Sequence, residues 1–223
     1  MSDTQKKTNT MQWECILFDL DGTLVDSEKL NFQAYAALIP EITESQASLI
    51  ERYEGMQFAA VVRDIEQRYS LKMPDDFETL FRDHVRGLFE DGLRPIAGIP
   101  ELLPALSQQI CVASNAPPKK LAHALQVTDL AQHFGDNVFS AYDINAWKPK
   151  PDLFLHAAEK MGFAPEQCAV IEDSPTGVEA AIAAGMQVFH YTPKQRRENK
   201  PGYVNIVDME ELRNILLNDY PAP

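Results

Sequence analysis

The sequence predicts an α/β fold, namely a doubly wound parallel sheet into which an all-helical cap subdomain is inserted. Short apolar runs recur along the 223-residue chain with helical segments between them, a pattern typical of parallel strands joined by helices. One long stretch, residues 29–94, has no such run and places its apolar residues at helical spacing instead. A chain of this length can bury one sizeable core, so we expect it to fold alone.

The expected strands are apolar runs that end at a polar or glycine-containing break. In chain order they are Trp13–Leu20, Ile110–Ser114, Val138–Ala141, Cys168–Glu172, Val188–Tyr191 and the more weakly patterned Tyr203–Val207. Three of the expected helices have recognisable ends. Pro117 precedes the first, at Lys119–Gln126; Gly162 stops the second, at Asp152–Met161; Asp173 or Ser174 caps the third, which ends at Gly185.

The helical stretch divides the chain into two expected units. Residues 11–28 together with 95–223 would form the sheet-containing core, and residues 29–94 would form the cap. Gly92, Pro95 and Gly98 cluster at the second junction, as a hinge would require. Residues 1–10 are polar and are expected to be a disordered leader, either native or derived from a vector.

Composition and charge narrow the classes of partner. A formal net charge of −13 and a pI of about 4.8 argue against nucleic acid and anionic membrane surfaces, which attract basic proteins. No apolar stretch approaches the ~18 residues of a membrane span, and no signal peptide is evident, so we expect a cytoplasmic protein. Cys15, Cys111 and Cys168 lack metal-site spacing and are expected to be buried free thiols.

Two carboxylates follow the first expected strand. Asp19 and Asp21 are two positions apart, so they leave the strand on the same side as it opens into the loop at Gly22. Neighbouring carboxylates repel each other and need a cation or a shared proton, and Mg²⁺ with a phosphate ligand would satisfy that need. The alternative is an acidic loop that caps the next helix.

Polar side chains also follow the later strands, where ligands of an open parallel sheet bind. Ser114 and Asn115 stand before a helix, where they could bind a phosphate oxygen or simply cap the helix. Lys148 lies between Trp147 and a proline, in a backbone stiff enough to aim an ammonium group inward. Glu172 and Asp173 end the fourth expected strand and suit a hard cation, although Asp173 could also cap a helix.

These segments together resemble the four motifs of the haloacid dehalogenase superfamily, in the same order along the chain. The matching residues are Asp19-Leu-Asp21-Gly22-Thr23-Leu-Val-Asp26-Ser27, Ser114-Asn115, Lys148-Pro-Lys-Pro and Glu172-Asp173-Ser174. The resemblance implies phosphoryl transfer through an aspartyl-phosphate with Mg²⁺ as cofactor. It also implies the haloacid dehalogenase-like form of the α/β core, with a small phosphate ester as the binding partner.

The resemblance also implies a role for each matching residue. Asp19 would be the nucleophile, Asp21 the general acid and then the general base, and Lys148 the cation that neutralises the transferring group. The metal ligands would be Asp19, the Asp21 backbone carbonyl, Asp173 and, more weakly, Glu172. The phosphate would be held by Ser114, Asn115, Lys148 and the backbone amides around Gly22 and Thr23.

Within the superfamily, the chain is similar to bacterial sugar-phosphate and sugar-acid-phosphate phosphatases, most of all in the segment at residues 140–149. Dehalogenases lack the carboxylate at Asp21, and phosphonoacetaldehyde hydrolases use a cap lysine that this chain lacks between Lys29 and Lys72. Beta-phosphoglucomutases carry a histidine where this chain has Asn31. Asn31 therefore disfavours mutase activity. The alternatives to a phosphatase are a sugar-phosphate mutase and a non-catalytic sugar-phosphate sensor.

The cap is expected to contribute to substrate recognition. Related enzymes often place a cationic residue where this chain has Gln57, so the resemblance gives less support to an anionic substrate. We expect Gln57 to lie near the leaving group when the cap closes, with Arg52 and Arg63 as alternative cations. The sequence does not predict the oligomeric state.

Overall fold

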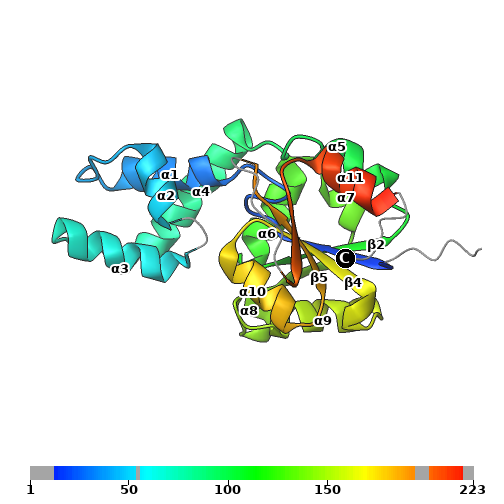
Figure 1. The fold of residues 1–223 in the computed structure, drawn as a ribbon. Helices are drawn as coiled ribbons and strands as arrows, with labels where there is room; N and C mark the ends of the chain where they lie inside the picture. Colours follow the sequence, from blue (N-terminus) through cyan, green and yellow to red (C-terminus); the bar gives the residue numbers. More distant parts are fainter. Residues whose placement is uncertain (1–12, 54–55, 194–200, 218–223) are drawn as a thin grey trace, which may run out of the picture.

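The computed structural model describes residues 13–53, 56–193 and 201–217, and within them it contains one six-stranded parallel sheet (Figure 1). The strand order is β3-β2-β1-β4-β5-β6, which is that of a doubly wound sheet. The strands are β1 Cys15–Phe18, β2 Gln109–Ser114, β3 Val138–Ser140, β4 Cys168–Glu172, β5 Gln187–Tyr191 and β6 Tyr203–Ile206. The predicted fold class is therefore confirmed. The expected leader at residues 1–10 lies outside the described residues.

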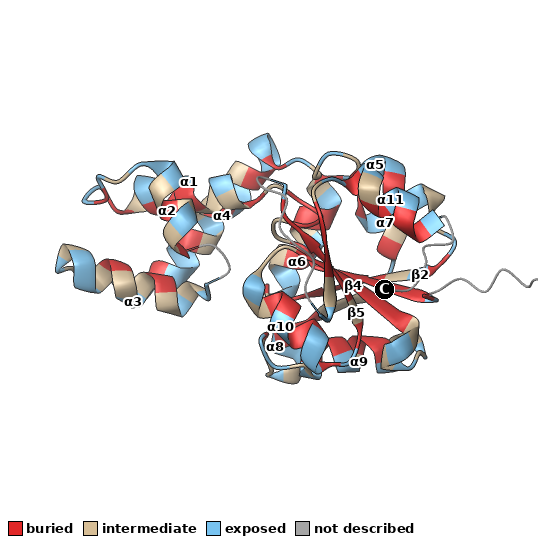
Figure 2. Cartoon of the chain, in the orientation of Figure 1, coloured by how far each residue is buried: buried red, intermediate tan, exposed pale blue. Residues whose placement is uncertain are grey.

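Helices cover both faces of this sheet. One face packs against α8 Ala141–Ile144, α9 Asp152–Met161 and α10 Pro175–Ala183. The other face packs against α5 Ile99–Leu102, α6 Pro118–Val127, α7 Ala131–Phe134 and α11 Met209–Leu217. Cys15 and Leu17 face the first layer, while Ile16 and Phe18 face the second, because successive strand residues point to opposite sides. Figure 2 shows the strands buried and the outer helix surfaces exposed.

The helix ends follow the predicted signals with small shifts. Gly162, with a φ of 84°, ends α9, and Pro117 occupies the N-cap of α6. Of the two residues expected to cap the third helix, Ser174 does so, because its hydroxyl accepts a hydrogen bond from Gly177 N at 3.1 Å. Two short 3₁₀ turns, Leu103–Ala105 and Pro165–Gln167, complete the connections.

The stretch between β1 and β2 begins with four helices that lie beside the sheet rather than on it (Figure 1). We call α1 Glu28–Leu38, α2 Gln46–Tyr53, α3 Phe58–Tyr69 and α4 Phe77–Gly92 the helical region. Its described residues contain no strand, as predicted. Aromatic side chains hold it together, with Tyr35 and Phe81 at a centroid distance of 4.3 Å. Helix α4 also contacts α6, which joins the helical region to the core.

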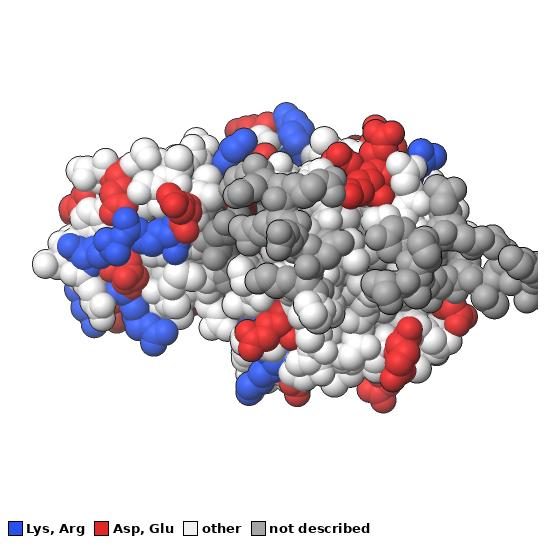
Figure 3. Space-filling model, viewed as in Figure 1, with Lys and Arg blue, Asp and Glu red and all other residues white. Residues whose placement is uncertain are grey.

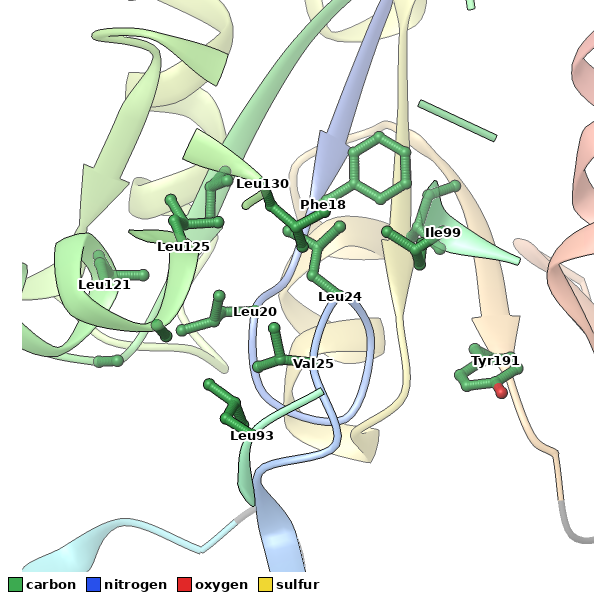
Figure 4. Packing of buried hydrophobic residues seen from close by; sticks show 14 of the residues in the cluster. Phe18, Leu20, Leu24, Val25, Leu93, Ile99, Leu121, Leu125, Leu130 and Tyr191 are labelled. Atoms are coloured by element: carbon green, nitrogen blue, oxygen red, sulfur yellow. The ribbon is translucent and has the colours of Figure 1, made fainter. Parts of the chain in front are cut away.

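The loop after β1 is fixed by its own hydrogen bonds. The strand ends at Phe18, two residues before the expected end at Leu20, since the N–H groups of Leu24 and Val25 both donate to the Leu20 carbonyl. Leu20, Leu24 and Val25 are buried, and Figure 4 shows them among the packed side chains around this loop. The loop that carries the predicted catalytic residues is therefore anchored in the core on both sides.

Two further observations concern the cysteines and the apolar character of the helices. Cys15, Cys111 and Cys168 are buried and free, as predicted. Among the described residues, none of the helices combines the length and the apolar character needed to cross a membrane.

Candidate active site

An ammonium group lies between two carboxylates at the carboxyl edge of the sheet. Asp19 directly follows β1 and Glu172 ends the neighbouring strand β4, so both side chains emerge at this edge. Lys148 lies in the loop before α9. Its Nζ donates to Asp19 Oδ1 at 2.5 Å and to Glu172 Oε2 at 2.6 Å. All three residues are buried, so these ion pairs are shielded from solvent.

Asp173 joins these groups to form what we call the acidic cluster: Asp19, Glu172 and Asp173. Each offers a carboxylate oxygen, and the three oxygens lie within 4.8 Å of one another. Two glycines leave space for the cluster. A Cβ on Gly22 would lie 2.1 Å from Asp173 Oδ2, and a Cβ on Gly177 would lie 2.0 Å from the Glu172 Cδ. Any larger residue at these positions would displace a carboxylate of the acidic cluster.

Hydroxyl groups orient two of these carboxylates. Thr23 Oγ1 donates to Asp173 Oδ1 at 2.9 Å, and Ser174 donates to Glu172 Oε1 from its backbone N–H at 3.0 Å and its hydroxyl at 2.8 Å. The sequence predicted Gly22 and Thr23 as phosphate-binding residues. In the structure the Gly22 N–H donates to the Val25 carbonyl at 2.9 Å instead, because the loop closes on itself.

Asp21 lies two residues further along and is held by two side chains. Ser27 Oγ donates to its Oδ1, and Lys120 Nζ lies 2.8 Å from both carboxylate oxygens. Lys120 comes from the first turn of α6. The sequence analysis did not identify Lys120 or Ser27 as positioning groups for Asp21. A signal was present, since two lysines follow the proline pair that starts α6.

Ser114 and Asn115 follow β2 at the same edge. Ser114 is buried, and its Oγ accepts a hydrogen bond from the Ala116 N–H at 3.2 Å. This local contact is of the kind expected from the alternative prediction, in which Ser114 caps the helix that follows. The Asn115 amide makes two contacts with Lys148: its Oδ1 accepts from the Lys148 N–H at 2.9 Å, and its Nδ2 donates to the Lys148 carbonyl at 3.4 Å. Asn115 therefore fixes the loop that carries the buried lysine.

Crowding of charges shifts the pKa values of this site. Burial, followed by the charge of Glu172, raises the pKa of Asp19 to about 7 against the attraction of Lys148. Burial and the charges of Glu172 and Asp19 raise the pKa of Asp173 well above its ordinary value. Burial alone would lower the pKa of Lys148, but Asp19 and Glu172 outweigh it and raise that pKa. Lys148 is therefore charged, and ionisation of all three carboxyl groups would give the acidic cluster more negative charge than one ammonium neutralises.

This charge balance fits a divalent cation. Two of the three carboxylates pair with one ammonium group, and oxygens of all three converge at a spacing that one ion can bridge. Mg²⁺ prefers carboxylate and carbonyl oxygens as ligands, and its charge offsets the mutual repulsion that, after burial, contributes to the two raised pKa values. The donor set expected from the sequence, Asp19, Glu172, Asp173 and the Asp21 backbone, therefore suits this ion in chemical type.

The acidic cluster opens into a cavity of about 1000 Å³ between the core and the helical region. Asp19, Asp21, Ser114, Asn115, Lys148 and Asp173 line its core side. Gln57, at the N-cap of α3, and Asn31 line the side of the helical region. Of the alternative cations, Arg52 pairs with Glu44 at 2.8 Å, and neither Arg52 nor Arg63 lines the cavity.

The cations that do line the cavity on this side are Arg82 and Arg86 of α4, which the sequence analysis missed. Helical periodicity identifies which face of α4 is apolar, but it does not say which of its charged residues face a cavity formed with another part of the chain. Figure 3 shows, for one face of the molecule, that lysine and arginine side chains gather over the helical region despite the acidic total charge.

Curated relatives with similar sequences are phosphatases. The 6-phosphogluconate phosphatase of Escherichia coli K12 is 35% identical over 191 residues, which cover 84% of this chain and 86% of that protein. A phosphorylated carbohydrates phosphatase of Thermotoga maritima is 28% identical over 217 residues, which cover 91% and 98%. These names agree with the prediction of a phosphoric monoester hydrolase.

Solved structures and a family model agree with these relatives. A haloacid dehalogenase-like protein of unknown function from Agrobacterium tumefaciens superposes with a TM-score of 0.78 at 28% identity, covering 92% of this chain and 98% of that one. A haloacid dehalogenase family hydrolase from Deinococcus radiodurans, with bound phosphate and sodium, gives 0.75 at 28% identity, with 92% and 96% covered. The family model for haloacid dehalogenase-like hydrolases matches residues 13–185. The chain therefore belongs to the haloacid dehalogenase-like hydrolase family.

Proposed function

We propose that this protein is a magnesium-dependent phosphatase that hydrolyses small phosphate monoesters, namely sugar or sugar-acid phosphates, through an aspartyl-phosphate intermediate. The observation that carries the proposal is the convergence of Asp19, Lys148 and Asp173 at the floor of one cavity, with Glu172 directly behind them. Relatives named for 6-phosphogluconate and for phosphorylated carbohydrates support the substrate class.

In the first half-reaction an Asp19 carboxylate oxygen attacks phosphorus, and the bond between phosphorus and the ester oxygen breaks. Asp19 is a weak nucleophile, so its effectiveness depends on being held in line with the leaving group. The contact with Lys148 fixes its carboxylate, and the same ammonium lies where negative charge grows on the phosphoryl oxygens. Ser114 lines the cavity on this side and supplies a hydroxyl to the phosphate.

Asp21 moves the proton in both half-reactions. It gives a proton to the leaving alkoxide and then takes one from the water that cleaves the aspartyl-phosphate, releasing inorganic phosphate and restoring Asp19. Ser27 and Lys120 hold its carboxylate beside the cavity. Mg²⁺ bound by Asp19, Asp173, the Asp21 carbonyl and, more weakly, Glu172 would supply a Lewis acid that draws charge from the phosphoryl group.

We assign the cap role to residues 29–94 and the catalytic core to residues 11–28 and 95–223. The support is that the helical region forms one wall of the cavity while the core forms its floor. Closure of this wall over a bound ester would exclude water from the first half-reaction. Gln57 then lies on the leaving-group side, where its amide could contact sugar hydroxyls.

The alternatives have less support. Asn31 lines the cavity in place of the histidine of beta-phosphoglucomutases, so a mutase lacks that group here. A sensor would have no need for Asp19, Asp21, Lys148 and Asp173 at one edge of the sheet.

A substrate panel tests the proposal. The protein would be incubated with Mg²⁺ and sugar, sugar-acid, polyol and nucleotide monophosphates, and both inorganic phosphate and isomerised product would be measured. We expect phosphate release from sugar or sugar-acid phosphates, which EDTA and Asp19→Asn each abolish. Isomerisation without phosphate release would favour the mutase, and no turnover of any ester would favour the sensor.

A further inference from the structure

We propose that Arg82 binds a carboxylate on the leaving group and makes this enzyme selective for sugar-acid phosphates over the corresponding neutral sugar phosphates. The inference rests on the proposed phosphatase function and deepens it, since it names the substrate class and a residue that selects it. Arg82 takes the place of Arg52 and Arg63, the alternative cations of the sequence analysis, neither of which lines the cavity.

Arg82 crosses the cavity from the helical region to the core. Arg82 belongs to α4. Its Nη2 donates at 3.1 Å to the Oη of Tyr142, a residue of α8. Both side chains line the cavity that contains Asp19. A guanidinium group therefore lies in the wall of the proposed site. It is positively charged and comes from the helical region, whereas the acidic cluster comes from the core.

Several contacts hold this guanidinium in place. Its Nε donates to the Glu78 Oε1 at 2.9 Å and its Nη2 donates to the same oxygen, which makes an ion pair at i,i+4 spacing. Its central carbon lies 5.8 Å from the Phe58 ring and 6.0 Å from the Tyr142 ring. The remaining nitrogen, Nη1, has no hydrogen-bond partner among the residues that the structure describes. With the side chain 33% exposed, the guanidinium is held and still has donors to offer to a ligand.

A short chain of contacts relates Arg82 to the phosphate end of the site. The Tyr142 ring packs edge-on against Trp147 at a centroid distance of 5.4 Å, and Trp147 directly precedes Lys148. The cation that binds the leaving group and the cation that binds the phosphoryl group are thus linked through two aromatic rings. These rings fix the separation between Arg82 and Lys148, so the two anionic ends of a substrate must lie at a matching separation.

Other cations near the cavity are less suited to this role. Lys148 is taken up by Asp19 and Glu172, and Lys120 contacts both oxygens of Asp21. Arg86 lies one turn further along α4, but its side chain is 61% exposed, and its pairing with Asp83 at 3.4 Å is loose. Arg82 pairs with Glu78 as well, but that ion pair leaves its Nη1 without a hydrogen-bond partner in the described part of the chain, and the Tyr142 contact fixes the guanidinium in the cavity wall.

The expected selectivity follows from the strength of one contact. A hydrogen bond between charged groups is worth more than one between a guanidinium and a hydroxyl, by an amount that corresponds to roughly 3- to 30-fold in affinity. The test compares gluconate 6-phosphate with glucitol 6-phosphate, because the two esters differ at one end only, where a carboxylate replaces a hydroxymethyl group. The wild-type protein should show the higher kcat/KM for gluconate 6-phosphate.

Arg82→Gln should remove this preference. We expect kcat/KM for gluconate 6-phosphate to fall about tenfold or more, mainly through KM, while the value for glucitol 6-phosphate changes by less than about threefold. Arg68→Gln is the matched control, because Arg68 pairs with Asp64 at the i,i+4 spacing that also joins Arg82 to Glu78. Arg68 does not line the cavity, so the ratio of the two kcat/KM values should stay as in wild type.

Three results would overturn the inference. They are a wild-type protein that hydrolyses both esters equally, an Arg82→Gln variant that loses both equally, and an Arg86→Gln variant that loses the preference while Arg82→Gln keeps it. Failure of the proposed function looks different, since neither ester would be hydrolysed by any variant. In that case calorimetric binding of the two esters to wild type and Arg82→Gln still decides whether Arg82 recognises the carboxylate.

Discussion

At the scale of single residues, two glycines make the acidic cluster possible. Gly177 lies in α10, where a Cβ would approach the Glu172 Cδ to 2.0 Å, while Gly87 lies in α4, where a Cβ would meet nothing within 4 Å. Both positions are helical, so helix propensity favours alanine equally at each. The difference between them isolates the steric demand of the active site.

Gly177→Ala should therefore reduce activity while Gly87→Ala should not. The added methyl group pushes Glu172 away from Lys148, and such overpacking costs about 1–3 kcal/mol of folding free energy. Gly87→Ala should stabilise the protein by up to about 1 kcal/mol. Urea unfolding and phosphate release check both variants, and equal behaviour of the two would refute the steric argument.

Lys120 offers a second residue-scale prediction. It touches both oxygens of Asp21, so Lys120→Met should let the proposed acid–base group leave its position. Since positioned general acids contribute roughly 10²- to 10⁴-fold, we expect at least about a tenfold loss of kcat with little change in KM. Steady-state kinetics measure this. Lys119→Met, which removes an exposed neighbouring charge, is the control, and a comparable loss in that variant would assign the effect to charge rather than to position.

Sequence reasoning succeeded where a motif places a residue at a strand end. Asp19, Ser114 and Glu172 all lie at the carboxyl edge of the sheet, because apolar runs joined by helices predict parallel strands and the carboxyl ends of parallel strands share one edge. It did not foresee that the Asn115 side chain fixes Lys148 or that Thr23 holds Asp173, since such contacts depend on distances between loops. The roles of these residues in catalysis stay predictions.

At the scale of elements, the helical region depends on its aromatic interior. Tyr35 from α1, Phe58 from α3 and Phe77 and Phe81 from α4 lie within 6.3 Å of one another in successive ring pairs. These ring pairs join only helices of the helical region, although the buried residues among them, Tyr35, Phe77 and Phe81, belong to the same apolar cluster as the second face of the sheet. Loss of one ring should therefore loosen the helical region more than the central strands.

Phe81→Ala should show this local effect. Loss of a buried phenyl group costs about 3–5 kcal/mol, and we expect most of it to appear as faster amide exchange in α1, α3 and α4. Hydrogen-exchange mass spectrometry would measure it, with β1, β2 and β4 as internal reference. Equal acceleration in these central strands would mean that core and helical region unfold as one unit.

The sequence predicted the helical region but not its internal arrangement. The spacing of Phe58, Val61 and Ile65 fixes an apolar face of α3, and Val61 and Ile65 are indeed buried. The short helices α5, α7 and α8 escaped prediction because four residues carry too little periodicity to stand out. The Arg82–Tyr142 contact escaped it as well, because it joins α4 to α8 across the cavity.

At the scale of the whole molecule, the acidic cluster couples stability to pH and to metal. A carboxyl whose pKa is raised in the folded chain binds its proton more tightly when folded, so ionisation costs stability. The pKa of Asp19 rises from 3.8 to about 7. The stabilisation of the folded chain that this shift provides is therefore fully present below about pH 4 and is lost as the pH rises toward 7. Asp173 shifts in the same direction.

Asp173→Asn should therefore change the stability in opposite senses with and without metal. In EDTA at pH 8 the variant should be more stable than wild type, because one crowded carboxylate is gone. With Mg²⁺ the wild type should gain stability and the variant should gain far less. Thermal unfolding at pH 5 and pH 8 checks this. An equal response of both proteins to Mg²⁺ would contradict a metal site at Asp173.

The proposed function requires Asp19 to be a nucleophile that carries the phosphoryl group during turnover. The most direct measurement is acid quenching of the enzyme during hydrolysis of a sugar-acid phosphate, followed by peptide mass spectrometry to locate the phosphoryl group. We expect a phosphorylated Asp19 in wild type. We expect no phosphorylated residue at this position in Asp19→Asn, which should also be inactive. A phosphoryl group on another residue, or undiminished turnover by Asp19→Asn, would contradict it.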